Sequence, residues 1–119
     1  MIKVDVKKVN NEITNIHISG HSEYDEFGKD IVCASVSSIV ITSVNAIIKL
    51  DNSIKFKQES GNVIINVIKH TKNTDILINN MLELLENLEK QYKNNIKINK
   101  EGGVTDVWFN EIRYSIIRT

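Results

Sequence analysis

Residues 31–49 limit what this chain can fold into more than any other feature, because they form a long, mostly apolar segment without a turn signal. The β-branched content of the segment favours a strand, but its length and the absence of apolar–polar alternation favour a helix. We therefore expect a helix from about 31 to 49, apolar over much of its circumference and hence central in the fold. Its apolar positions at helical spacing are Val32, Val36, Ile39, Val40, Val44, Ile47 and Ile48.

The first nineteen residues predict a β-hairpin. Residues 2–7 alternate apolar and charged side chains, as a half-buried strand does. A second strand follows over residues 13–18 and ends at Ser19-Gly20. Asn10-Asn11 lies between the two strands, and asparagine tolerates the positive φ of a tight turn.

The second half of the chain predicts another hairpin and another helix. Residues 53–57 and 62–69 are short apolar runs joined by Glu59-Ser60-Gly61. The helix is expected to open at Thr74-Asp75, and residues 96–98 suggest a short last strand. The apolar stripe of this second helix consists of Ile78, Met81, Leu82, Leu85, Leu88 and Tyr92.

The element order β-β-α-β-β-α predicts the α+β class: a sandwich of two long helices packed on an antiparallel or mixed sheet. The 119 residues suffice for one domain, and the hydrophobic fraction of 41% is typical of globular chains. Gly102-Gly103 looks like a boundary, so we expect a domain over 1–101 and a tail over 102–119. Three interpretations of the tail stay open: an added strand, a partner-binding peptide or an appendage peculiar to this chain.

Charge and cysteine content exclude several classes of function. Fifteen basic residues balance fifteen acidic ones, so binding that rests on phosphate neutralisation alone is excluded and no direct nucleic-acid contact is expected. Cys33, the only cysteine, leaves no intramolecular disulfide and no zinc knuckle. No signal-peptide core and no apolar stretch of about 20 residues is evident, so we expect a cytoplasmic protein without a membrane partner.

Chemistry-bearing residues gather between residues 20 and 33. Gly20-His21 follows the second strand, and Gly28-Lys29-Asp30 leads into the apolar helix. Asp30 is a good N-cap, which would make Cys33 the third residue of the helix. The positive end of the helix dipole favours a thiolate there, although the nearby Asp30 partly opposes this effect.

Residues 22–32 are long enough to fold back and bring His21 to Cys33. A cysteine and a histidine in contact form the minimum apparatus of a thiol hydrolase, with helix N–H groups as oxyanion donors. The structural alternative stays open, because a single cysteine on an apolar helix is most often a small buried hydrophobe. The three histidines and Cys33 fit no zinc-site spacing, so we expect no metal and no cofactor.

The run GHSEYDEFGKDIVCASVSSIVITSVNAI resembles the signature of the ribosomal-processing cysteine proteases, the Prp family. That signature has Gly-His, a short variable loop, Gly-x-Asp-Ile-Val-Cys-Ala and a helix with Ser-Val-Asn-Ala. The resemblance covers roughly residues 1–99. The matching positions are Gly20, His21, Gly28, Asp30, Ile31, Val32, Cys33, Ala34, Ser43, Val44, Asn45 and Ala46.

The resemblance implies that Cys33 is the nucleophile and His21 the general base. Asp30 matches a third site position, which we interpret as a cap and organiser rather than as a triad acid. Ser37 matches a serine common in the family, and it either steadies the thiol or lets the helix pack closely. Gly20 and Gly28 support the site, Gly28 as a plausible hinge.

The activity implied by the resemblance is removal of an N-terminal extension from a bacterial large-subunit ribosomal protein, number twenty-seven. Tyr24 and Phe27 would close an apolar groove for the substrate from a mobile loop over residues 22–29. Equally, both rings would simply pin that loop to the core. Ala34 and Ser35 line the groove in this interpretation, and Ser35 narrows it where family members often have glycine.

The resemblance also implies a homodimer, with the ribosomal protein precursor as the substrate partner. The remaining histidines are weaker candidates: His17 faces away from its apolar neighbours, and His70 sits in a turn rich in Lys and Thr. The alternative function is a non-catalytic ribosome-associated module that binds protein or RNA.

Overall fold

The computed structural model describes residues 1–20 and 27–102. The described elements follow the order β-β-α-β-β-α-β, which confirms the predicted α+β class and the predicted last strand. They are β1 (Ile2–Val9), β2 (Glu12–Ser19), α1 (Phe27–Leu50), β3 (Ile54–Glu59), β4 (Asn62–Val67), α2 (Lys72–Gln91) and β5 (Ile96–Gly102).

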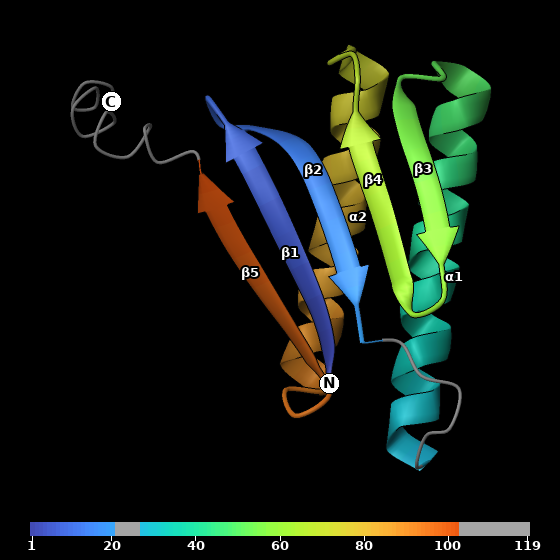
Figure 1. The fold of residues 1–119 in the computed structure, drawn as a ribbon, viewed down its shortest axis with the longest axis vertical. Coiled ribbons are helices and arrows are strands. Elements are labelled where there is room, and N and C mark those ends of the chain that lie inside the picture. The colour runs from blue at the N-terminus through green and yellow to red at the C-terminus, as the bar shows by residue number, and fades with distance from the viewer. Residues whose placement is uncertain (21–26, 103–119) are drawn as a thin grey trace.

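The five described strands form one mixed sheet in the order β3-β4-β2-β1-β5. β1 pairs antiparallel with β2 and parallel with β5, so the first strand of the chain lies inside the sheet. Both helices cover the same face of this sheet, which leaves two layers (Figure 1). Gly102, predicted as the first residue of the tail, is instead the last residue of β5, and the rest of the predicted tail, residues 103–119, lies outside the described part of the chain.

Both predicted hairpin turns are confirmed. Asn10 and Asn11 have φ of 52° and 67°, in the left-handed region that asparagine tolerates. The β3–β4 turn is Ser60-Gly61, and Gly61 has a φ of 74°. Because β2 pairs with β4, the two hairpins join edge to edge into one sheet.

The apolar segment is helical as predicted, but α1 starts at Phe27 and not at residue 31. Residues 27–29, predicted as loop, therefore belong to its first turn. The prediction that this helix is central does not hold among the described residues, which cover only one side of it. That side buries Val32, Val36, Val40, Val44 and Ile47, whereas Ile41, Ile48 and Leu50 are exposed.

By length and composition alone, residues 31–50 of α1 would suffice to cross a membrane. This differs from the expectation that no segment of the chain is long and apolar enough. The buried side of α1 nevertheless packs into the same core as the strands, with Val36 and Ile47 completely inaccessible to solvent. In this fold the segment is thus a core helix with one exposed side.

The helix α2 also starts earlier than predicted, at Lys72. Thr71 is its N-cap: the hydroxyl of Thr71 accepts a hydrogen bond from the Thr74 amide at 3.1 Å. The predicted apolar stripe is confirmed, because Ile78, Met81 and Leu85 are buried against the sheet and α1.

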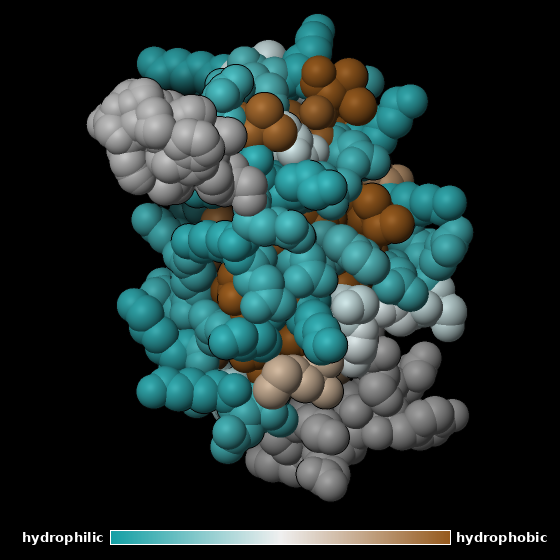
Figure 2. All heavy atoms as spheres, turned by 60° about the vertical axis from the view of Figure 1, so that its left-hand side comes forward, coloured by the Kyte–Doolittle hydropathy of each residue, from teal (hydrophilic) through white to brown (hydrophobic). Residues whose placement is uncertain are grey.

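The second face of the sheet carries polar side chains and faces solvent. On β1, Lys3 is exposed between buried Ile2 and Val4, Lys7 is exposed after buried Val6, and Asn99 of β5 donates a hydrogen bond to Asp5 at 3.1 Å. Figure 2 shows the molecule with the β5 side forward, and hydrophilic side chains dominate this view. The alternation read from the sequence therefore separates a core face from a solvent face.

Candidate active site

Cys33 lies on α1 beside a pocket of about 520 Å³, which separates the helix from the β3–β4 hairpin. The cysteine is half-buried, and it packs against the edge of the hydrophobic core. The helix wall consists of Cys33, Ala34, Val36, Ser37, Val40 and Ile41, and the hairpin wall consists of residues 58–63. The only cysteine of the chain therefore borders a hollow of a size suited to side chains of a peptide.

Helical periodicity decides which predicted residues join Cys33 on this pocket. Ser37 is one turn further along α1, so it lies on the same side of the helix as Cys33. Ala34 also lines the pocket. The sequence grouped these three residues, and the structure places them together.

Ser35 lies on another side of α1, contrary to the expectation that it narrows the groove beside Cys33. Two residues along a helix correspond to a rotation of about 200°. Ser35 lines a separate hollow between α1 and α2, together with Ser38 and Leu84. Its hydroxyl donates a hydrogen bond to the carbonyl of Ile31 at 2.9 Å.

The early start of α1 overturns the prediction that Asp30 is the N-cap. Asp30 lies within the first turn, and Cys33 lies in the second turn rather than at the third position. The dipole effect falls off within the first turn, and the amide of Cys33 is not among the first four unpaired N–H groups. The fold therefore offers less dipolar activation of this thiol than the sequence suggested, which leaves more of that work to a base.

Gly20 sits where the chain leaves β2 for residue 21, and its geometry admits only glycine. Its φ is +86°, and a Cβ atom added there would stand 2.3 Å from the carbonyl oxygen of Met1. Any side chain at this position would thus push β2 away from the start of β1. The glycine of the Gly-His pair is explained by the backbone, independently of catalysis.

The hairpin wall of the pocket is the part of the site that sequence reasoning missed. Gln58, Glu59 and Ser60 come from the end of β3 and its turn, far from the Gly-His and Cys motifs in sequence. The only signal that connects them to the site is register: Ser19, just before Gly20, pairs with Asn62. Strand pairing cannot be read from local sequence pattern.

Side-chain contacts brace this wall. His17 Nε2 lies 2.9 Å from Asn62 Oδ1, and Asn62 Nδ2 donates to the carbonyl of Ser60 at 3.2 Å. The Glu59 carboxylate is the one charged group among the described residues that line the pocket, and it pairs with Lys57 at 3.1 Å. His17 thus supports the pocket from the solvent face of the sheet.

Several predicted site residues fall outside what the structure describes. His21 and Tyr24 lie in the segment 21–26, and Phe27 and Asp30 are placed as backbone of α1 only. Gly28, predicted as a hinge, belongs to the first turn of the helix. The roles predicted for His21, Tyr24, Phe27 and Gly28 stay predictions, whereas Asp30 is not the N-cap of α1.

Comparison with known proteins identifies the class to which this fold and pocket belong. Residues 1–97 match the family model described as cysteine protease Prp. A ribosomal processing cysteine protease Prp of Staphylococcus aureus is 35% identical over 105 residues, which cover 83% of this chain and 98% of the relative. This chain belongs to the Prp family, and it is a cysteine protease.

Two solved structures of an S. aureus ribosomal processing protease Prp share the fold. One, in complex with a covalently linked product peptide, has a TM-score of 0.76 at 30% identity and covers 85% of this chain and 100% of its own. The other, in complex with a substrate peptide, has a TM-score of 0.75 at 28% identity with the same coverage. Both similarities support the α+β assignment.

Proposed function

We propose that this protease removes the N-terminal extension of the large-subunit ribosomal protein number twenty-seven, with Cys33 as nucleophile and His21 as general base. The observation that carries the proposal is the half-buried Cys33 on a pocket between α1 and the β3–β4 hairpin. The similarity to Prp proteins named for ribosomal processing supports the substrate. The alternative of a non-catalytic module does not agree with membership in a protease family.

The topology supports a role for His21. β2 ends at Ser19, which pairs with Asn62 in the wall of the pocket. Gly20 then turns with a positive φ, and His21 is the next residue. Gly20, the residue before His21, therefore follows a strand end that pairs with the hairpin wall, while α1 presents Cys33 from the opposite side of the pocket.

In the proposed reaction, His21 takes the proton of the Cys33 thiol, and the sulfur attacks the carbonyl carbon of the scissile peptide bond. The C–N bond then breaks, and His21 returns the proton to the departing amine, which leaves an acyl thioester on Cys33. Water attacks the thioester, with His21 accepting its proton. The C–S bond then breaks, the carboxylic acid leaves, and His21 returns the proton to the sulfur, which restores the thiol without any cofactor.

The proposal is tested by incubating the full chain with the unprocessed ribosomal protein of the same organism and measuring the new N-terminus by mass spectrometry. Cys33→Ala and His21→Ala should each lower the cleavage rate about a thousandfold or more, as removal of a nucleophile or its base does in other hydrolases. His17→Ala is the histidine control and should keep its kcat, because His17 contacts only the hairpin wall of the pocket. Cleavage that persists in Cys33→Ala would overturn the assignment of the nucleophile.

Alkylation of the thiol gives a test that needs no substrate. An ordinary cysteine reacts mainly as the pH approaches about 8.5, because the thiolate is the reactive form. We expect iodoacetamide to modify Cys33 rapidly at pH 7, and His21→Ala to move the rise in rate toward higher pH. Slow modification of a folded wild-type protein at pH 7 would contradict an activated thiol.

The proposal includes a homodimer in the cytoplasm, where ribosomal proteins are assembled. Ile41, which also lines the pocket, and Ile48 are seven residues apart on α1, with exposed fractions of 39% and 42%. Apolar groups in one stripe favour a partner surface over solvent. Sedimentation analysis of wild type and Ile48→Glu tests the dimer: a wild-type monomer would contradict it.

A further inference from the structure

A cluster of three ionisable side chains lies away from the pocket, at the opposite end of the sheet. Glu12 is the first residue of β2, His70 lies between β4 and α2, and Asp75 lies in the first turn of α2. One ligand atom from each residue lies within 4.8 Å of the others. Seven residues of strand separate Glu12 from Ser19 beside the pocket wall, which is about 23 Å.

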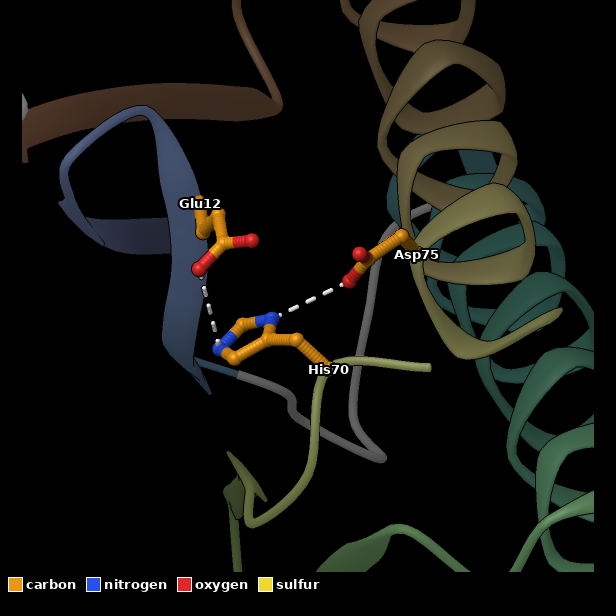
Figure 3. A group of neighbouring side chains, drawn as sticks. All are labelled: Glu12, His70 and Asp75. Atoms are coloured by element: carbon orange, nitrogen blue, oxygen red, sulfur yellow. Dashed lines mark hydrogen bonds and ion pairs between the residues drawn. The ribbon is translucent and has the colours of Figure 1, made fainter. Parts of the chain in front are cut away.

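The imidazole of His70 stands between the two carboxylates, as Figure 3 shows. Its Nδ1 atom lies 3.0 Å from Asp75 Oδ1, and its Nε2 atom lies 4.0 Å from Glu12 Oε1. The short contact requires a proton on Nδ1, since a carboxylate oxygen only accepts. In the neutral ring, Nε2 then carries a lone pair that faces the negative charge of Glu12.

Two acceptors that face each other are bridged by a proton, by a water that donates to both, or by a metal cation. Neither carboxylate pairs with a lysine anywhere in the described chain, so His70 is their only ionic partner there. The half-charge at the N-terminus of α2 opposes a cation at this place, but the two full negative charges of Glu12 and Asp75 outweigh it. The cluster therefore favours the binding of a proton or of a metal cation.

We propose that His70 Nε2 and the Glu12 carboxylate bind a zinc ion, with Asp75 holding the imidazole from behind. Zinc bonds of about 2.1 Å would put the two ligand atoms about 3.4 Å apart at a tetrahedral angle. The observed gap of 4.0 Å closes by a shift of the exposed Glu12 side chain, while water completes the coordination. A carboxylate on the second nitrogen of a metal-binding histidine is a recurring arrangement, because it fixes the tautomer.

The backbone holds two of the three residues in place. Thr71, the residue after His70, caps α2, and the Asp75 amide donates to its carbonyl at 2.9 Å. His70 and Asp75 therefore occupy positions N′ and N4, where many helices place an apolar pair that fixes the entry of the chain. Here that pair is polar, and the zinc ion would extend it to Glu12 and tie the β1–β2 hairpin to α2.

The test is zinc titration by calorimetry on the metal-free, reduced full chain carrying Cys33→Ser, which removes the thiol as a competing ligand. We expect one saturable zinc site, weakened at least tenfold by His70→Gln and by Glu12→Gln. Asp75→Asn should weaken it about tenfold, as loss of an outer carboxylate does. His17→Gln is the matched histidine control and should bind zinc as the parent does.

A second measurement identifies the ligand atom. In the parent variant, the imidazole nitrogen resonances should show that zinc perturbs Nε2 of His70 while Nδ1 keeps its proton. Absence of saturable binding, or binding unchanged by His70→Gln, would overturn the proposal. The cluster would then act as a polar helix staple only, which is seen as a loss of thermal stability in His70→Gln without any zinc-dependent shift in the parent. Loss of substrate cleavage in Cys33→Ser has no bearing on either readout.

Discussion

Each end of the sheet carries reactive or ligand-forming side chains, and the two ends differ in how the chain brings these side chains together. At the end of the sheet near the start of α1, Cys33 and Gly20-His21 lie within fourteen residues of sequence, so one short motif identifies the site. At the other end, Glu12, His70 and Asp75 come from three separate elements. A site encoded by one contiguous segment can be recognised in the sequence, whereas a site that forms by strand pairing cannot.

The largest expected effect tests whether the two ends act independently. Cys33→Ala should lower cleavage about a thousandfold or more, whereas His70→Gln should leave the rate within about twofold, because the ends are a full strand length apart. Single-turnover cleavage of the same substrate measures both. A rate loss above tenfold in a folded His70→Gln protein would show that the two ends are coupled and do not act independently.

Among the variants at the end of the sheet near the start of α1, Gly20→Ala should lower the stability most. A Cβ atom 2.3 Å from the Met1 carbonyl, together with a φ of +86°, forces a backbone shift. We expect the free energy of unfolding to fall by about 1–3 kcal/mol, as for strained left-handed positions. Urea denaturation measures it.

The matched control for Gly20→Ala is Gly61→Asn, because asparagine tolerates the φ of 74° in the β3–β4 turn. This control should lose clearly less stability than Gly20→Ala. An equal loss in both variants would mean that the close approach of Gly20 to Met1 has no energetic consequence.

The assignment of the two sides of α1 is tested by a pair of adjacent serines. Ser37 lines the pocket with Cys33, and Ser38 lines the hollow toward α2. Both are exposed, so Ser37→Leu and Ser38→Leu should fold alike. We expect Ser37→Leu to raise the KM for the peptide about tenfold by filling the pocket, and Ser38→Leu to leave it unchanged.

The smallest effect concerns the brace of the hairpin wall. His17→Ala removes the contact of Nε2 with Asn62, and a hydrogen bond of this kind contributes about 1 kcal/mol. We expect a loss of that size in unfolding free energy and a rise of a few-fold in KM, with kcat preserved. A loss of kcat instead would give His17 a part in the chemistry that its place on the solvent face does not suggest.

The sequence predicted element types well and element starts less well. Alternation identified the first hairpin, and period-3.6 spacing identified α2, because each side chain pattern follows from local geometry. Both helices nevertheless start earlier than expected. Thr71 caps α2, three residues before the predicted opening at Thr74-Asp75. α1 continues back through Gly28 to Phe27, since a glycine near a helix end costs only about 1 kcal/mol.

The candidate site divides in the same way. The sequence located Cys33 with Ala34 and Ser37, because residues one turn apart share a side of a helix. It misplaced Ser35, and it had no means of finding Glu59 or Asn62. Those residues reach the pocket only because β4 pairs with β2, a contact between segments more than forty residues apart.

By itself, then, the sequence determined the α+β class, the reactive-cysteine signature and the family, all of which follow from short-range patterns. The tertiary structure decided the strand order, the hairpin wall opposite Cys33 and the convergence of Glu12, His70 and Asp75. The physical reason is that strand pairing and helix docking are selected by burial of the whole apolar core. No local segment carries that information, because the core exists only when all the elements have come together.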